Sequence, residues 1–240
     1  MTPFAQIAEH CPDSELGIIR ELLIYDILCP VSCPFARGSV GELVFNTVPS
    51  PLHWSRQTEW PWALRAADLL PSDIVLDVGS GWSVLKYAMA RRCRKVVALE
   101  CNREFAERTQ PTIDAMRKRY RTDISQVVGD VRGMSFVDGC FDKVICVSVL
   151  EHMETGHMEA LQEMKRVLKP GGRLVLTMDV LINGKQEDDF YLDRENAEKL
   201  LTDLGIAEVR KMHPDSLIGA RVGDNGTEII VVMAYWDKPL

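Results

Sequence analysis

Apolar positions along the chain follow two periods, which together predict alternating strands and helices from residue 73 onward. Short runs rich in β-branched residues are separated by stretches whose apolar side chains recur at helical intervals. Strands alternating with helices at this spacing predict a doubly wound parallel sheet with right-handed crossovers. The strands are expected at Ile74–Val78, Val96–Leu99, Ser125–Val128, Lys143–Val147 and Arg173–Met178, and the helices at Val84–Arg92, Arg103–Tyr120 (interrupted by Pro111) and Met158–Leu168.

The last part of the chain has a different pattern. A helix is expected at Glu195–Leu204, where Gly205 ends it. Two strand-like runs follow, at Ile206–Met212 and Glu228–Trp236, without a helix between them. Two successive strands of this kind predict an antiparallel pair at the end of an otherwise parallel sheet.

The first 70 residues lack this alternation. Apolar residues recur at helical spacing over residues 16–27, and Cys29-Pro30 ends that pattern. The segment Asn46–Trp62 contains three prolines and three tryptophans and is predicted to be too irregular for a core element. We therefore expect residues 1–70 to form an N-terminal helical and aromatic cap or lid rather than an independent domain, and residues 71–240 to form the main domain.

Composition restricts the classes of function. The chain has 240 residues, 46% hydrophobic and 26% charged, which excludes a disordered or low-complexity protein. Its 28 Lys and Arg against 35 Asp and Glu give a formal charge of −7, which disfavours nucleic acid as a partner. The chain has seven cysteines and no secretory pattern, which predicts free thiols and a cytoplasmic location. It has no apolar run long enough to span a membrane, so we expect no membrane segment.

A glycine-rich turn follows the first predicted strand, in Asp77-Val78-Gly79-Ser80-Gly81. Glycine lets the backbone turn tightly and approach a ligand, and ligands of open α/β sheets bind beyond the strand ends. A dinucleotide fingerprint would need a glycine where the chain has Val84. The carboxylate of Asp77 would repel a pyrophosphate but attract an ammonium group. The turn therefore favours a cationic or zwitterionic ligand.

Two further acids stand at the ends of the second and third predicted strands. Glu100 is placed to accept hydrogen bonds from both hydroxyls of a ribose, and Asp130 from an adenine amino group. The alternative is that each carboxylate only caps the helix that follows its strand. Three acids at consecutive strand ends favour the ligand-binding interpretation.

The order of these motifs resembles the class I S-adenosylmethionine-dependent methyltransferases, in the branch with small-molecule substrates. The resemblance implies a mostly parallel seven-stranded sheet with an antiparallel last strand, the Rossmann-like methyltransferase fold. It also implies that Asp77 and the Gly79–Gly81 turn, Ser80 included, hold the methionine part of the cofactor, Glu100 the ribose, and Asp130 with Val131 the adenine. The matching segments are Val75–Gly81, Glu100, Gly129-Asp130, Phe141–Ile145, Ser148–His152 and Leu168–Leu174.

The implied reaction moves a methyl group from S-adenosylmethionine to an oxygen or nitrogen of a small-molecule acceptor, leaving S-adenosylhomocysteine. Because the sulfonium is already activated, the protein mainly aligns the acceptor and excludes water. A hydroxyl acceptor benefits from a general base, for which His152 is the candidate; the alternative is a structural histidine. Ser148 stands where metal-binding relatives have the first of two glutamates, and Glu151 with His152 alone makes a poor site for a hard metal, so we expect no metal. We also expect Ser148 to contact the cofactor.

Aromatic residues outside these motifs are candidates for the acceptor pocket. Trp54 and Trp60 of the cap, with Phe190 and Tyr191 after the fifth strand, are expected to line it. The alternative for the tryptophans is that they attach the cap to the core through buried area. Arg56 is expected to pair with the cofactor carboxylate.

Two other functions stay open on the sequence alone. One is an NAD(P)-dependent oxidoreductase on the same kind of sheet, which Val84 and Asp77 argue against. The other is a catalytically inactive, cofactor-binding partner subunit. The acceptor and the oligomeric state are not determined by the sequence.

Overall fold

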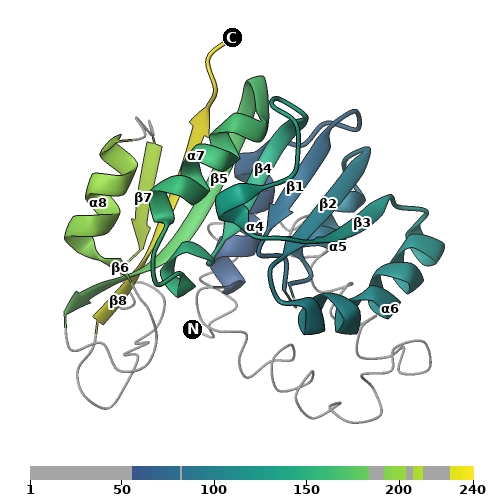
Figure 1. The fold of residues 1–240 in the computed structure, drawn as a ribbon, viewed down its shortest axis with the longest axis horizontal. Coiled ribbons are helices and arrows are strands. Elements are labelled where there is room, and N and C mark those ends of the chain that lie inside the picture. Colours follow the sequence, from purple (N-terminus) through teal and green to yellow (C-terminus); the bar gives the residue numbers. More distant parts are fainter. Residues whose placement is uncertain (1–55, 82, 184–191, 204–207, 213–227) are drawn as a thin grey trace, which may run out of the picture.

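The computed structural model describes residues 56–81, 83–183, 192–203, 208–212 and 228–240, which form one twisted β-sheet with helices packed against it (Figure 1). The sheet runs in the order β3-β2-β1-β4-β5-β8-β7, and β6 pairs with β5 outside this path. The strands are β1 (Ile74–Val78), β2 (Lys95–Glu100), β3 (Ile124–Val128), β4 (Phe141–Val147), β5 (Leu168–Asn183), β6 (Leu192–Asp193), β7 (Glu208–Met212) and β8 (Glu228–Asp237).

Strand directions confirm the predicted topology. β1 pairs in parallel with β2 on one side and with β4 on the other. β2 with β3, and β4 with β5, are also parallel. β8 is antiparallel to both β5 and β7, so the sheet is mostly parallel with an antiparallel last strand.

Alternating side chains of the central strands build a core on each face of the sheet. In β1, Leu76 and Val78 pack into one core and Val75 into the other, because successive side chains of a strand point to opposite faces. Helices α7 (His157–Val167) and α8 (Arg194–Asp203) cover the first core. Helices α4 (Arg56–Ala67), α5 (Leu85–Ala90) and α6 (Arg103–Tyr120) cover the second.

The structure corrects the prediction for the segment Asn46–Trp62. Its residues from Arg56 onward begin the regular helix α4, and Trp60 and Trp62 are buried in the core beside the sheet. Burial of two large aromatic side chains stabilises a helix that its prolines and tryptophans do not indicate locally. The part before Arg56 and the helix predicted over residues 16–27 lie outside the described residues. The domain boundary at residue 70 stays a prediction. The helix α4, which precedes this boundary in the chain, packs against β4 and β5.

The prediction that Pro111 interrupts its helix is also wrong, since α6 runs without a break through this residue. A proline inside a helix removes one backbone hydrogen bond, here to the carbonyl of Glu107, whose residue is exposed. The buried side chains Ile113 and Met116, which follow the proline, pack into the core and hold the second half of the helix in place.

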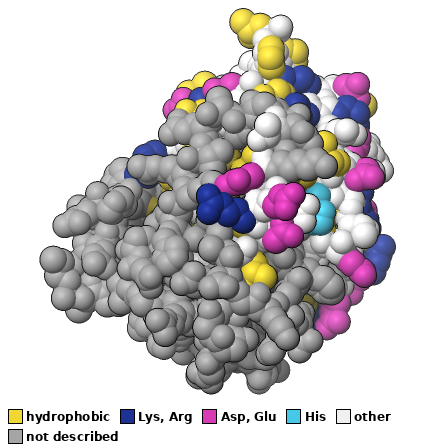
Figure 2. Space-filling model, turned by 90° about the vertical axis from the view of Figure 1, so that its left-hand side faces the viewer, with side chains coloured by type: hydrophobic (Ala, Val, Ile, Leu, Met, Phe, Trp, Pro, Cys, Tyr) yellow, Lys and Arg dark blue, Asp and Glu magenta, His cyan; other side chains and the backbone are white. Residues whose placement is uncertain are grey.

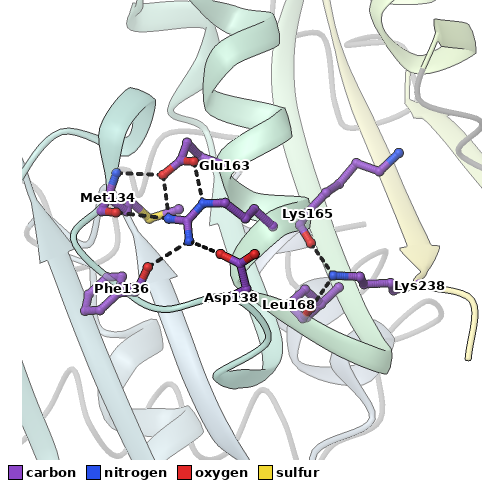
Figure 3. Close-up of polar contacts among 8 residues, drawn as sticks. Met134, Phe136, Asp138, Glu163, Lys165, Leu168 and Lys238 are labelled. Carbon is purple, nitrogen blue, oxygen red and sulfur yellow. Dashed lines mark hydrogen bonds and ion pairs between the residues drawn. The ribbon is translucent and has the colours of Figure 1, made fainter.

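Polar contacts fasten the loop after β3 and the last residues of the chain to the end of α7 (Figure 3). The guanidinium of Arg166 donates to Glu163, to Asp138 and to two carbonyl oxygens of the loop. The ammonium of Lys238 donates to two carbonyl oxygens at the junction of α7 and β5. These contacts lie where the parallel strands begin, so they stabilise the edge of the sheet opposite the glycine turn.

The face at the β7 end of the sheet carries charges of both signs (Figure 2). Acidic side chains are spread over the described part of this face, and Lys and Arg gather there only in small groups. Among the helices that the structure describes, none is both long and apolar enough to cross a membrane.

Candidate cofactor site

The glycine turn lies at the carboxyl edge of the sheet, directly after the central strand β1. Gly79 and Gly81 have φ angles of +62° and +39°, in the region that favours glycine. A Cβ atom on Gly79 would stand only 2.4 Å from Cγ2 of Val149, in the segment after β4. The turn therefore packs against its neighbour more closely than any residue with a side chain allows.

A pocket of about 320 Å³ opens beside this turn. It is lined by residues that follow β1, β2, β3 and β4, among them Gly79, Asp130, Val131, Val149 and His152. The strand order reverses at β1, because the chain proceeds from β1 to β2 and β3 on one side and to β4 and β5 on the other. A crevice at such a reversal is where open α/β sheets bind ligands.

Asp77 is buried beneath the turn, with 3% of its surface exposed. Burial raises the pKa of this carboxyl to about 6, while the Lys86 ammonium and a hydrogen bond from Ser80 lower it and the charge of Glu100 adds to the increase. Its Oδ2 atom is buried and has no hydrogen-bond partner among the described residues. A buried carboxylate oxygen in this state fits a ligand that brings a positively charged donor.

Glu100 connects the end of β2 to the glycine turn. Its Oε2 accepts a hydrogen bond from the backbone N–H of Gly81, and its Oε1 from that of Asn102, both at 2.9 Å. Oε1 also accepts a hydrogen bond from the Cys101 thiol. These contacts orient Glu100, and Oε2, with one hydrogen bond from the turn, can accept a further one from a hydroxyl group. Glu100 thereby also fixes the shape of the turn, and the sequence did not indicate this second role.

Asp130 follows β3 and forms an ion pair within its own loop. Its carboxylate accepts hydrogen bonds from the backbone N–H of Arg132 at 2.8 Å and from the Arg132 guanidinium at 2.6–3.0 Å. These contacts lower the pKa of Asp130. The turn-capping role that we weighed as an alternative is thus present, and Asp130 with Val131 also lines the pocket.

Ser148 directly follows β4, and its hydroxyl contacts α4. This hydroxyl donates to Oε1 of the fully buried Glu59 at 2.7 Å, and the hydroxyl of Thr177 in β5 donates to the same atom at 2.5 Å. Ser148 has a φ of +51°, an uncommon conformation for a residue with a side chain. The predicted contact between Ser148 and the cofactor stays a prediction.

His152 belongs to the short 3-10 turn η3 (Leu150–His152), is exposed and lines the pocket. The preceding Glu151 is fully buried, and its Oε1 accepts a hydrogen bond from the backbone N–H of Asp179 at 3.1 Å. In the part of the chain that the structure describes, no three His, Cys, Asp or Glu side chains are grouped as metal ligands. The predicted absence of a metal is not tested by this and stays a prediction.

Of the aromatic residues predicted to line the acceptor pocket, the structure describes Trp60. Trp60 is buried in the core among α4 and α5 side chains, which favours the alternative that it attaches this helix to the sheet. Trp54, Phe190 and Tyr191 lie outside the described residues, as does the side chain of Arg56, so these assignments stay predictions.

Sequence analysis missed Lys86, a fully buried lysine in α5. Its ammonium donates to the Ser80 hydroxyl at 2.9 Å and to the carbonyl oxygens of Ser80 and Gly81 at 3.1 and 2.6 Å. A charged residue in the first turn of an otherwise apolar helix, just after the glycine turn, was the signal that could have identified it.

Comparison with known proteins adds independent evidence. Residues 76–176 match the family model of a methyltransferase domain. The chain is 32% identical over 123 residues to the demethylmenaquinone methyltransferase of Mycolicibacterium vanbaalenii, an alignment that covers 51% of this chain and 47% of that protein. The chain therefore spans about half the length of this curated relative.

Solved structures show the same fold. The chain is similar to a Bacillus halodurans protein described as a methyltransferase, with a TM-score of 0.63 and 20% identity over 76% of this chain and 100% of that one. It is also similar to the [4+2]-cyclase SpnF, with a TM-score of 0.62 and 18% identity over 90% and 94% of the two chains. A cyclase among these structures means that the fold alone does not define the reaction.

The strand order, the glycine turn with its acid, and the matched family model agree with one another. Residues 76–176 match a methyltransferase domain, and the chain resembles the class I S-adenosylmethionine-dependent methyltransferases in its strand order and glycine turn. The resemblance seen in the sequence and the predicted Rossmann-like fold are thereby confirmed.

Proposed function

We propose that this protein transfers a methyl group from S-adenosylmethionine to an oxygen or nitrogen of a small-molecule acceptor. The observation that carries the proposal is the buried Oδ2 of Asp77, which has no hydrogen-bond partner among the described residues and adjoins a glycine turn at the sheet reversal. An ammonium group of an amino-acid ligand supplies both the donor and the charge that this oxygen needs. When bound, S-adenosylmethionine supplies an activated methyl group.

The residues around the pocket divide the binding of that cofactor among them. Asp77 binds the ammonium of the amino-acid end, and Glu100 accepts hydrogen bonds from ribose hydroxyls. Asp130 and Val131 line the pocket, and we assign the adenine to them, with Asp130 as the acceptor for its amino group and Val131 as an apolar contact. The absence of a Cβ at Gly79 lets the turn pack against Val149, which also lines the pocket.

His152 is the group that we assign to the acceptor. It is exposed at the pocket, on the turn after β4, where it can accept a proton from a hydroxyl acceptor. The negative formal charge supports a small molecule over nucleic acid as the partner. The name of the M. vanbaalenii relative, a demethylmenaquinone methyltransferase, supports a small-molecule acceptor as well.

Calorimetry with S-adenosylmethionine and S-adenosylhomocysteine tests the proposal. We expect micromolar-range binding of both by the unmodified protein, loss of binding in Asp77→Ala, and unchanged binding in Asp114→Ala, an equivalent change at an exposed acid of α6. Folded protein that binds neither ligand would contradict the proposal. Binding of NADH instead would support an oxidoreductase, and cofactor binding without methyl transfer to any member of a broad acceptor panel would support an inactive subunit.

A further inference from the structure

Lys86 places a buried positive charge directly beneath the glycine turn. It lies in α5, is 0% exposed, and its Nζ has hydrogen-bond distances to three oxygen atoms of two residues, Ser80 and Gly81. An ammonium group has three donors, so these three acceptors match it in number. The carbonyl contacts hold the turn in the conformation that Gly79 and Gly81 adopt.

The contacts of Lys86 continue through Ser80 to Asp77. The Ser80 hydroxyl accepts a hydrogen bond from Lys86 at 2.9 Å and itself hydrogen-bonds to the Asp77 carboxylate. A hydroxyl that accepts from a cation becomes a better donor, because hydrogen bonds in a chain polarise one another. Asp77 is thus connected to Lys86 through Ser80, and the Oδ2 atom of Asp77 has no hydrogen-bond partner in the described part of the protein.

A purely structural role for Lys86 would need only the two carbonyl contacts. Burying an ammonium is costly unless hydrogen bonds and an opposite charge compensate it, and Asp77 is a buried opposite charge acting on it. Lysine at this position therefore does two things: it closes the turn, and its charge stabilises the ionised form of Asp77.

We propose that Lys86 is a positioning residue of the cofactor site, which through Ser80 holds Asp77 as an oriented carboxylate and so makes the site selective for ligands with an amino-acid end. The proposal rests on the proposed function. It assigns Lys86 no contact with the reacting atoms. It requires that loss of the Lys86 charge weaken the recognition of one end of the ligand and leave recognition of the nucleoside end nearly unchanged.

Two ligands that differ at that end test the proposal. S-adenosylhomocysteine has the amino-acid group, and 5′-methylthioadenosine lacks it. In Lys86→Met, which keeps the length of the side chain without its charge, we expect affinity for S-adenosylhomocysteine to fall about tenfold or more and affinity for 5′-methylthioadenosine to change by less than about threefold. Lys118→Met, an equivalent change at an exposed lysine of α6, should affect neither.

The pH dependence of binding gives a readout that a structural role would not move. The titratable groups that act on Asp77 are Lys86 of α5, Glu100 of β2 and the buried Cys146 of β4. Removing the Lys86 charge raises the pKa of Asp77 further, so the pH below which S-adenosylhomocysteine binding weakens should be higher in Lys86→Met than in the unmodified protein. An equal loss of affinity for both ligands, or an unchanged pH dependence, would overturn the proposal.

Ser80→Ala decides the question if Lys86→Met does not fold, as judged by circular dichroism. This variant keeps both carbonyl contacts of Lys86 and removes only the link to Asp77. We expect the same selective loss of S-adenosylhomocysteine binding, and a uniform loss or none would overturn the proposal. Failure of the proposed function is distinguishable, because the unmodified protein would then bind neither S-adenosylmethionine nor S-adenosylhomocysteine.

Discussion

The carboxylate of Glu59 in α4 accepts a hydrogen bond of 2.7 Å from the hydroxyl of Ser148. Ser148 lies 89 residues later in the chain, directly after β4. Glu59 is fully buried, and Thr177 of β5 donates to the same oxygen. One carboxylate thus joins the first described helix to Ser148, directly after β4, and to Thr177 within β5. Val149, next to Ser148 in the chain, lines the cofactor pocket.

This contact predicts a loss of stability in Ser148→Ala. Glu59 would stay buried with one hydrogen bond fewer, and a hydrogen bond to a charged group contributes about 1.5–3 kcal/mol. We expect the free energy of unfolding, measured with urea at pH 7, to fall by an amount in this range. Ser72→Ala, on an exposed turn, is the control and should leave it unchanged. Equal stability of the two variants would mean that the contact contributes nothing.

Gly79→Ala should damage the cofactor site specifically. The alanine would have to adopt a φ of +62°, and its Cβ would overlap Val149, so either the turn or the pocket wall must move. We expect affinity for S-adenosylhomocysteine to drop by about tenfold or more. The double variant Gly79→Ala with Val149→Ala removes the overlap and should recover part of the affinity; no recovery would argue against this steric explanation.

Asp77 should make stability depend on pH. Its pKa is about 6 in the folded protein against an ordinary value of 3.8, so the folded state binds a proton more tightly than the unfolded state. The contribution of Asp77 to the free energy of unfolding therefore falls as the pH rises from about 4 to 6, and the loss is complete above 6.

The variant Asp77→Asn should reveal this loss. Because the amide does not ionise, we expect it to be more stable than the unmodified protein by about 1–3 kcal/mol above pH 6, and of similar stability near pH 4. Urea unfolding at both pH values measures the difference. The stabilised variant should no longer bind S-adenosylmethionine, and a variant that is less stable than the unmodified protein at pH 7 would contradict the burial argument.

His152→Ala should separate the two roles that we weighed for this residue. If His152 accepts the proton of a hydroxyl acceptor, turnover should fall by about 10²–10⁴-fold, while affinity for S-adenosylmethionine changes little. Glu154→Gln, a change in a second residue of the same pocket, serves as the comparison. Equal losses of turnover and cofactor affinity would assign His152 a structural role.

The sequence by itself determined the parts of this protein that depend on near neighbours in the chain. β1 and α6 have the predicted bounds, Ile74–Val78 and Arg103–Tyr120, because apolar periodicity reports which face of an element is buried. Gly79 and Gly81 were identifiable because a tight turn with positive φ selects glycine whatever surrounds it. The acids at three strand ends follow from the same local pattern.

Only the tertiary structure decided which buried polar groups meet. The hydrogen bonds that Ser148 and Thr177 donate to Glu59 join residues far apart in sequence. The helix around Trp60 forms against its local composition because the sheet offers a surface that buries the tryptophan. Polar groups that the fold removes from water need hydrogen-bond partners inside the protein. Which group lies near enough to be the partner depends on how distant segments pack together, and the order of residues in the chain does not give that distance.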